Sequence, residues 1–503
     1  MIRYAAAALL VAFLSACTSL SNTIETDLYG NPDQTGIRWG LVVADMDGDE
    51  LLALRPDDRF TPASNTKIAT TMAAFEWLDM LEMPDRAPGL SAYLQDNAEG
   101  SAPHLVLVGG GDAMIGDGPD CEIYCLAELA DQIASAGVPV IGDIIGDDTL
   151  FPDERWGPGW SQEDLQFYYG TAVSALTVNE NEVWLTVSPG AVEGDPADIA
   201  WRAGDDLYPL VNEVMTVAET GNRVIVRERQ PGTDTLRVFG EIPLGTEPVT
   251  YEMGIEDAAL FAALRLQRLL EARGVTVTGT ARARHRSLSL DDFPVDEPTD
   301  EEKADAVLAK GPLSRPGPDD GLNLIASLAP TPLVDSLERV SRDSQNLHAE
   351  LALRRLGLID GSGSRAHGLE KVKALWEAAG VTETGYAVYG GSGMSIYNRI
   401  TPRGMVKLLT YASTRPWFEA WKAQQPVAGL SGSLERRFKG TSLEGKLFAK
   451  TGTLNGANAL SGVMIARSGR ELTFSIIAND RPSLTRSAVP EMDAALVAIA
   501  GAY

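Results

Sequence analysis

Three short groups of residues carry side chains suited to acyl transfer. Ser64 and Lys67 are three residues apart, Ser344-Gln345-Asn346 follows 280 residues after the first serine, and Lys450-Thr451-Gly452 lies near the C-terminal end. Together they supply a serine nucleophile, two amines and an amide. Each group alone is common in a chain of 503 residues. All three in this order, each in a fitting local context, predict a serine enzyme.

The first pair is expected at the start of a helix. Residues 61–63 are typical of a helix entry, and residues 68–78 are rich in helix formers with apolar spacing. Ser64 and Lys67 then share one face, and free N–H groups of the first turn favour negative charge on the serine oxygen. A lysine can remove the serine proton if burial or a second cation, for which Lys450 is a candidate, lowers its pKa. In the alternative interpretation, Ser64 only caps the helix and Lys67 is a solvated lysine.

The second group precedes a predicted helix over residues 347–356, whose apolar positions recur with helical spacing. Ser344 and Asn346 stand where cap residues stand, so a purely structural role as cap and turn is one interpretation. In the functional interpretation, Ser344 relays a proton and Asn346 binds an amide of the substrate.

The third group lies in a predicted strand pair, in which residues 447–450 are followed by a turn and by residues 457–465. A lysine on an edge strand often serves only as a solvated charge that blocks further pairing. Beside a serine nucleophile, Lys450, Thr451 and Thr453 can instead hold a carboxylate, with Gly452 between them. A backbone N–H near Thr453 can complete an oxyanion hole.

The triple motif resembles the signature of penicillin-binding proteins and serine β-lactamases. More specifically, the chain resembles the D-alanyl-D-alanine carboxypeptidase/endopeptidase family of low-molecular-mass class C penicillin-binding proteins, from about Gly36 almost to the C-terminus. The long gap between the first two motifs agrees with this family, in which accessory domains are inserted there. The further segments that carry the resemblance are 142–144, 147–151, 174–181, 344–347, Glu350-Leu351, 391–395 and 440–462.

Two positions depart from the family pattern. Gly390 stands where the family usually has an aspartate, and Ile396 stands where it often has an arginine. Both changes affect recognition of the acyl side of the substrate, in particular a free carboxylate on a diaminopimelate side chain. Arg399 is the nearby residue that can substitute for the missing arginine.

The N-terminus has the pattern of an export signal. Arg3 precedes a short apolar stretch over residues 5–13, which is too short to span a bilayer, and Leu14-Ser15-Ala16-Cys17 resembles a bacterial lipobox. We expect residues 1–17 to form a lipoprotein signal and a lipidated Cys17 to tether the mature protein to a membrane. The expected location is the bacterial periplasm, with the outer membrane as the preferred site of the anchor. The alternative is an ordinary secretory signal.

Cys121 and Cys125 are the two remaining cysteines, and in an exported chain they form a disulfide or stay as free thiols. The four histidines lack zinc-ligand spacing, so no metal and no cofactor are predicted. The net charge of −28 argues against nucleic acid as a partner. No oligomeric state is predicted.

The resemblance implies an α/β (α+β) transpeptidase-like domain, with an antiparallel sheet flanked by helices and a large inserted region. We expect the catalytic domain in residues 18–85 and 322–503, the insertion in 86–290, and an acidic, proline-containing linker in 291–321. The implied activity is that of a serine DD-peptidase that cleaves D-Ala-D-Ala ends, and D-Ala cross-links, of peptidoglycan stem peptides, with β-lactams as covalent inhibitors. The alternatives are a β-lactamase or esterase of the same fold and a non-catalytic wall-binding lipoprotein.

Overall fold

The computed structural model describes residues 24–26, 28–30, 35–83, 89–97, 101–118, 121–203, 207–230, 233–294, 321–481 and 487–503. The predicted signal segment with Cys17 lies outside these ranges, as does most of the predicted acidic linker. None of the helices in these ranges is long and apolar enough to cross a membrane.

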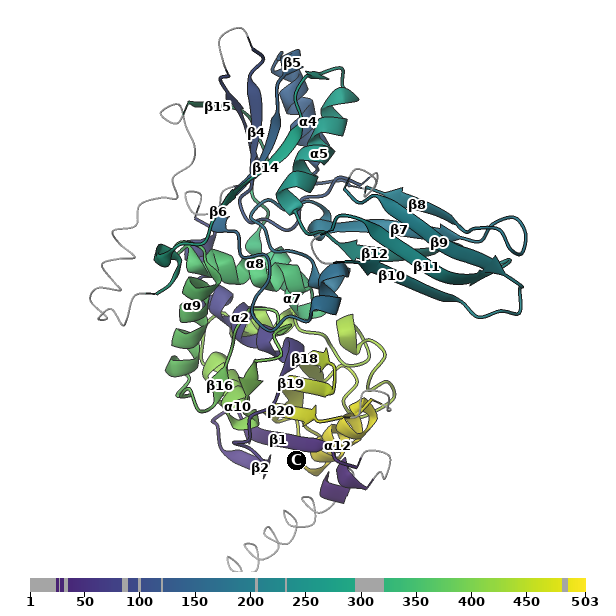
Figure 1. Cartoon of the computed structure of the whole chain (residues 1–503). Coiled ribbons are helices and arrows are strands. Elements are labelled where there is room, and N and C mark those ends of the chain that lie inside the picture. The colour runs from purple at the N-terminus through teal and green to yellow at the C-terminus, as the bar shows by residue number, and fades with distance from the viewer. Residues whose placement is uncertain are drawn as a thin grey trace, which may run out of the picture.

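A five-stranded antiparallel sheet forms the centre of the lower body of the molecule (Figure 1). Its three inner strands are buried along almost their whole length, because helices cover both faces of the sheet. In spatial order the strands are β18 (Leu447–Leu454), β19 (Ala457–Ile465), β20 (Glu471–Asn479), β1 (Arg38–Asp45) and β2 (Glu50–Leu54).

One face of this sheet is covered by the C-terminal helix α12 (Val489–Ala502), whose Leu496 and Ile499 share a core with the strands. The other face is covered by α10 and by a cluster of helices packed behind it. These helices are α2 (Thr66–Glu76), α3 (Leu78–Leu81), α7 (Leu333–Arg342), α8 (Asn346–Gly357), α9 (Arg365–Ala378), α10 (Pro402–Ser413) and α11 (Phe418–Ala423). This arrangement confirms the predicted antiparallel sheet between helices.

A second five-stranded sheet lies above α8 in Figure 1 and carries α4 (Leu126–Ser135) and α5 (Ala258–Glu271). Three of its strands are parallel and two are antiparallel to their neighbours. In spatial order they are β14 (Ala281–Arg286), β6 (Ile144–Pro152), β4 (His104–Val108), β3 (Ser91–Gln95) and β15 (Leu322–Ser327). A short parallel pair, β5 (Val140–Ile141) and β13 (Thr276–Val277), continues from this layer.

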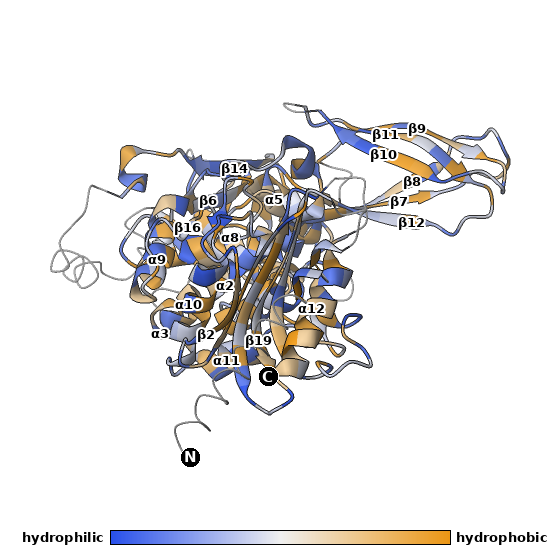
Figure 2. Cartoon of the chain, turned by 90° about the horizontal axis from the view of Figure 1, so that it is seen from below, coloured by the Kyte–Doolittle hydropathy of each residue, from blue (hydrophilic) through white to orange (hydrophobic). Residues whose placement is uncertain are grey.

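Two three-stranded sheets form an arm that projects from the body in both views (Figures 1 and 2). Their inner residues belong to one hydrophobic core, which continues into the core beneath α4 and α5. The strands are β12 (Val249–Gly254), β7 (Glu182–Ser188) and β8 (Asp198–Arg202) in one sheet, and β10 (Val224–Arg229), β11 (Leu236–Pro243) and β9 (Leu210–Val217) in the other.

The residues that follow the boundary expected near residue 322 form a strand of the second sheet. Leu322–Ser327 forms β15, which pairs with β3 and completes the sheet of the inserted region, because Leu322 and Ala326 bury their side chains there. We therefore propose that the insertion ends after Ser327 and that the catalytic domain resumes with α7. The remaining short elements are η2 (Ala63–Asn65), η3 (Gln162–Gln166), η4 (Tyr168–Gly170), η5 (Asn179–Asn181), η6 (Leu290–Asp292), η8 (Gly432–Leu434), β16 (Tyr386–Ala387) and β17 (Arg399–Ile400).

Candidate active site

Ser64 lies in the short 3-10 turn η2, directly before α2. The expected helix is present, but it begins with this tighter turn, and Ala63 takes a left-handed φ of 48°. The next residue, Asn65, is fully buried. In the amide orientation that satisfies both of its ends, Asn65 Nδ2 donates to the Lys450 carbonyl at 2.8 Å and Oδ1 accepts from the Ser461 backbone N–H at 3.2 Å. The nucleophile segment is thus anchored to β18 and β19.

The Lys67 amine is completely buried and has three oxygen neighbours. Its Nζ lies 3.0 Å from Ser64 Oγ, 2.6 Å from Asn346 Oδ1 and 2.6 Å from the Ser392 carbonyl oxygen. The last two are acceptors only, whereas a hydroxyl both donates and accepts. A neutral amine has two N–H bonds and one lone pair. It therefore donates to the amide and carbonyl oxygens and directs its lone pair at the Ser64 hydroxyl.

The environment of the two lysines favours this neutral form. Burial lowers the pKa of Lys67 well below its usual value, the Lys450 charge lowers it further, and the Glu350 carboxylate opposes both. Burial alone lowers the pKa of Lys450 to about 7. Burial and the charge of Lys450 therefore favour the neutral form of Lys67, while Lys450 itself retains a substantial protonated fraction near neutral pH.

Ser344 is held by Lys450, whose Nζ donates to Ser344 Oγ at 2.7 Å. Ser344 has a left-handed φ of 61°, which is costly for a residue with a side chain. It does not cap α8. Instead the side chain of Gln345 accepts from the Leu347 N–H at 3.1 Å and is the cap of that helix. The capping interpretation of Ser344 is therefore wrong, and its hydroxyl is directed to the lysine pair.

Asn346 connects the inserted region to the catalytic centre. Its Nδ2 donates to the Tyr169 carbonyl at 2.7 Å, and this contact leaves its Oδ1 facing Lys67. Tyr169 belongs to η4, in the part of the chain expected as an insertion. The insertion therefore contributes directly to the orientation of a predicted site residue.

Strand β18 is the edge strand of the central sheet and lies against the nucleophile turn. Lys450 on this strand is buried, so it is not the solvated edge charge of the alternative interpretation. A side chain at Gly452 would place its Cβ 2.6 Å from the Pro62 carbonyl oxygen, so only glycine allows this approach. Thr451 Oγ1 donates to Ser433 Oγ at 2.7 Å, and Asn458 Nδ2 donates to Thr453 Oγ1 at 3.3 Å.

Glu350, which carries part of the family resemblance, was not predicted to belong to the site. It is buried on α8, and its Oε1 accepts from the Ser392 N–H at 2.9 Å and from the Ser392 hydroxyl at 2.6 Å. The carbonyl of the same serine accepts from Lys67, so Glu350 fixes one of the acceptors around that amine. The sequence signal that could have identified Glu350 is an acidic residue between Leu347 and Leu351, on a helix whose apolar residues recur with helical spacing.

The two departures from the family pattern have different surroundings. A Cβ on Gly390 would lie 2.9 Å from Glu350 Oε1, so the space beside this glycine is already occupied by a carboxylate. Ile396 is half exposed. Arg399 donates from Nη1 to the carbonyls of Ile396 at 2.7 Å and Asn398 at 2.8 Å. Its guanidinium therefore braces its own loop.

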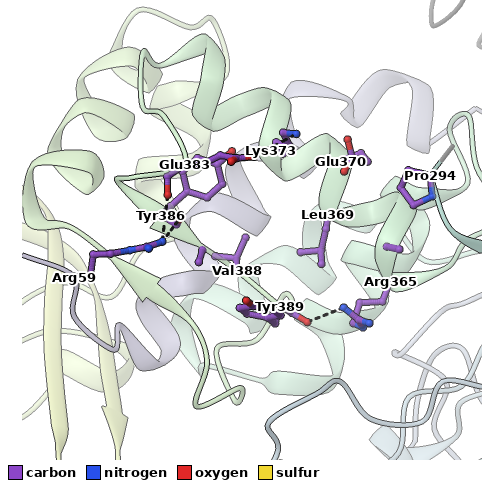
Figure 3. A pocket seen from close by; sticks show the side chains of 12 residues that line it. Arg59, Pro294, Arg365, Leu369, Glu370, Lys373, Glu383, Tyr386, Val388 and Tyr389 are labelled. Carbon is purple, nitrogen blue, oxygen red and sulfur yellow. Dashed lines mark hydrogen bonds and ion pairs between the residues drawn. The ribbon is translucent and has the colours of Figure 1, made fainter. Parts of the chain in front are cut away.

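The segment that leads to Ser392 is braced by two arginines. Figure 3 shows a pocket of about 480 Å³ beside α9, with Arg59 and Arg365 at its two ends. Arg59 Nη2 donates to the Tyr386 carbonyl at 2.8 Å, and Arg365 Nη1 donates to the Tyr389 carbonyl at 3.2 Å. These two contacts hold the backbone that continues into Gly390 and the Ser392 carbonyl.

Cys121 and Cys125 are joined by a disulfide between Gly118 and the start of α4. Their Cα atoms are 5.9 Å apart. The bond closes a small loop of the inserted region.

The sequence of this chain is similar to known D-Ala-D-Ala carboxypeptidases along most of its length. The model of the D-Ala-D-Ala carboxypeptidase 3 (S13) family matches residues 20–290 and 303–503. A D-alanyl-D-alanine carboxypeptidase of Actinomadura sp. (strain R39) is 33% identical over 482 residues, which are 92% of this chain and 81% of the relative. Penicillin-sensitive carboxypeptidase A of Dictyostelium discoideum is 24% identical over 91% of this chain and 86% of its own length.

The solved structures agree on the fold. Penicillin binding protein 4 of Haemophilus influenzae superposes with a TM-score of 0.76 and covers 95% of this chain and 98% of its own, at 19% identity. The insertion is therefore an integral part of a shared architecture.

Proposed function

Because the chain belongs to the D-Ala-D-Ala carboxypeptidase 3 (S13) family, we propose that Ser64 is the nucleophile of a serine DD-peptidase. The enzyme is a hydrolase, a serine-type D-Ala-D-Ala carboxypeptidase. The single observation that supports the nucleophile is the surroundings of Lys67. A buried amine with two acceptor-only partners lies 3.0 Å from Ser64 Oγ.

The reaction has two steps. Ser64 Oγ attacks the carbonyl carbon between two D-alanines, its proton passes to Lys67, and a C–O bond forms. The C–N bond then breaks while a proton passes to the leaving amine through Ser344, which Lys450 supports by its hydrogen bond. Water releases the acyl group in the second step. D-Ala cross-links between stem peptides offer the same scissile bond, so endopeptidase activity follows from the same residues.

The remaining motif residues hold the ends of the substrate. Lys450, Thr451 and Thr453 bind the terminal carboxylate, Asn346 binds an amide of the acyl side, and Gly452 lets β18 approach the serine. Backbone N–H groups of Ser64 and Thr453 stabilise the oxyanion, a contribution worth about 3–4 kcal/mol for each donor. Ile396 offers no charge to a side-chain carboxylate of the substrate, and Arg399 is engaged with its own loop.

β-Lactams present the same shape and charge as the D-Ala-D-Ala end and acylate Ser64. The relatives named for their penicillin sensitivity or penicillin binding support this proposal. The peptidoglycan substrate implies a location at the cell wall. We further propose that residues 1–16 are removed and that a lipid on Cys17, then the first residue of the mature protein, anchors the enzyme to a membrane facing the periplasm, with the outer membrane preferred.

A time course of intact mass with benzylpenicillin tests this function. The wild-type protein should gain the mass of one penicilloyl group and keep it for many minutes, and Ser64→Ala should gain none. Rapid loss of the adduct with hydrolysis of excess penicillin would identify a β-lactamase instead. A wild-type protein that never gains the mass would indicate a non-catalytic wall-binding protein.

A further inference from the structure

The turn Asn179–Asn181 has a backbone conformation that calls for an explanation. Asn179, Glu180 and Asn181 have φ angles of 51°, 53° and 54° in succession, and none of them is glycine. Left-handed residues that carry a side chain persist only where the surrounding structure holds them, and they concentrate at functional sites. The turn lies in the inserted region, yet it reaches the second motif of the catalytic domain.

The two asparagines of the turn hold its backbone in place. Asn179 Oδ1 accepts from the Asp117 N–H at 2.9 Å. Asn181 is completely buried, and its Nδ2 donates to the Ala172 carbonyl at 2.9 Å. The middle residue, Glu180, makes neither of these contacts, so its side chain is free to face the catalytic domain.

Glu180 binds the residue between the two catalytic members of the second motif. Gln345 Nε2 donates to Glu180 Oε2 with a short contact, and Arg339 Nη2 donates to Glu180 Oε1 at 2.6 Å. His348 Nε2 lies 3.4 Å from the same oxygen. Burial opposes ionisation of Glu180, but His348 and Arg339 outweigh it and lower the pKa of the carboxyl to about 2. The carboxylate is thus charged and strongly held.

Gln345 transmits this contact to its neighbours. Its Oε1 caps α8 through the Leu347 N–H, while its Nε2 is held by Glu180, so both ends of its amide are fixed. On one side stands Ser344 in its left-handed conformation beside Lys450. On the other side stands Asn346, whose Oδ1 faces Lys67. A rotation of the peptide units on either side of Gln345 would move the Ser344 hydroxyl away from Lys450. It would also move the Asn346 side-chain amide away from Lys67.

We infer that Glu180 is a positioning residue, which acts through Gln345 to hold Ser344 and Asn346 in register with Lys450 and Lys67. The strained turn of the insertion is the support that brings this carboxylate to the motif. The kinetic test of this inference rests on the proposed function, because it measures acylation by penicillin. Its structural readout, the local exchange of backbone amides, does not depend on activity.

The test compares Glu180→Ala with wild type and with a matched control, Glu213→Gln. Glu213 also pairs with an arginine, Arg237, but on β9 in the projecting arm (Figure 1). Acylation by a fluorescent penicillin is resolved into the binding constant and the rate of the chemical step. In Glu180→Ala the chemical step should slow by about tenfold or more with little change in binding, because misplaced catalytic groups reduce the rate after binding. Glu213→Gln should match wild type.

A double-mutant cycle with Gln345→Ala identifies the route of the effect. If Glu180 acts through Gln345, the double variant should be no slower than the slower single variant, whereas independent effects would multiply. Hydrogen exchange of the peptide covering residues 343–348 should increase in Glu180→Ala without any ligand. Glu180→Asp, which keeps the charge, should recover part of the chemical step if the turn can shift.

The outcomes separate the two proposals. A wild-type protein that is not labelled by penicillin refutes the proposed function. Hydrogen exchange of residues 343–348 in Glu180→Ala still tests whether Glu180 positions the second motif. A labelled wild type with an unchanged chemical step in Glu180→Ala refutes the positioning role. Multiplicative effects in the cycle would also refute it, because they would show that Glu180 does not act through Gln345.

Discussion

At the scale of single residues, the chemistry depends on two buried amines with different partners. Lys67 faces two acceptor-only oxygens and one hydroxyl, whereas Lys450 faces the Ser344 hydroxyl and the Thr451 carbonyl. The pKa of Lys67 is lowered by burial and by the charge of Lys450, while burial alone lowers that of Lys450. One amine is therefore suited to accept the proton of Ser64, and the other to remain the cation that attracts a carboxylate.

The first prediction concerns the pH dependence of acylation by penicillin. On the acidic side the rate constant should fall as Lys67 becomes protonated, since only its neutral form can take the Ser64 proton. On the alkaline side it should fall above about pH 7, where Lys450 loses its charge in the free enzyme. Stopped-flow measurement of kcat/KM against pH should give a bell-shaped curve. A rate that rises steadily to pH 10 would show that the charge of Lys450 is not needed.

The second prediction concerns Glu350, whose negative charge raises the pKa of Lys67. Glu350→Gln keeps an oxygen that can accept from Ser392 but removes the charge. The pKa of Lys67 should therefore fall, and the acidic limb of the acylation profile should move to lower pH. Glu370→Gln on α9 removes a charge of the same kind beside the pocket of Figure 3 and is the control. An acidic limb that stays in place in Glu350→Gln would mean that Glu350 only anchors the loop.

At the scale of elements, the site is an assembly of η2, the N-terminus of α8 and the edge strand β18. Asn65 ties the nucleophile turn to β18 and β19, and the Tyr169 carbonyl orients Asn346 at the start of α8. Glu350 accepts from the Ser392 N–H and hydroxyl, while the Ser392 carbonyl accepts from Lys67. Each of the proposed catalytic groups therefore depends on a contact with another element, which is the preorganisation that acyl transfer requires.

The third prediction tests the approach of β18 to η2. Gly452→Ala places a methyl group 2.6 Å from the Pro62 carbonyl oxygen, so the strand must move away from the serine. A displacement of this kind costs up to about 100-fold in rate when the reacting groups lose alignment. We expect a fall of at least about tenfold in acylation with the fold retained in circular dichroism. Gly501→Ala at the end of α12, where a Cβ has open space, should acylate like wild type. Normal acylation of Gly452→Ala would contradict the account of this approach.

Local patterns predicted the elements that carry the motifs better than they predicted the contacts between them. The helix after Ser64, the helix after Asn346 and the strand pair around Lys450 were all expected from periodicity and turn residues. The contacts of Lys67 with the Ser392 carbonyl and of Asn346 with the Tyr169 carbonyl were not. Backbone carbonyls carry no sequence signal, and the groups they join are 325 and 177 residues apart.

The position of residues 322–327 was also not predictable from the local sequence. The sequence of this strand gives no sign of which sheet it joins, and its pairing with β3 is the reason for proposing that it belongs to the insertion. By contrast, the order of sheet and helices in the catalytic domain could be expected as soon as the three motifs identified the family.

At the scale of the whole molecule, the insertion is both a support for the site and a projecting body. Its α8-facing part shares a small core with the catalytic domain, in which Phe151 and Val173 meet Leu347 and Leu351. Its arm extends away from the catalytic sheet in both views (Figures 1 and 2). Substitutions on the α8-facing part should therefore change catalysis, while those on the arm should leave the chemical step unchanged.

The fourth prediction concerns the attachment of the whole enzyme. Expressed with its own N-terminus in a bacterial host, the protein should carry a lipid on Cys17 and sediment with the membrane fraction. Cys17→Ser should remove the lipid and release the enzyme, because the anchor is the only attachment proposed. Labelling with a radioactive fatty acid and fractionation measure both effects. A wild-type protein found in the soluble fraction with an unmodified residue 17 would show that the lipobox interpretation is wrong.

The most direct test of the central claim is to locate the penicilloyl group after a brief reaction at neutral pH. The wild-type protein is digested, and the modified peptide is identified by tandem mass spectrometry. The account predicts one modified residue, Ser64, because its hydroxyl lies 3.0 Å from the buried Lys67 amine, whose pKa burial lowers well below its usual value. An adduct on Ser344, on a lysine or on no residue at all would contradict it.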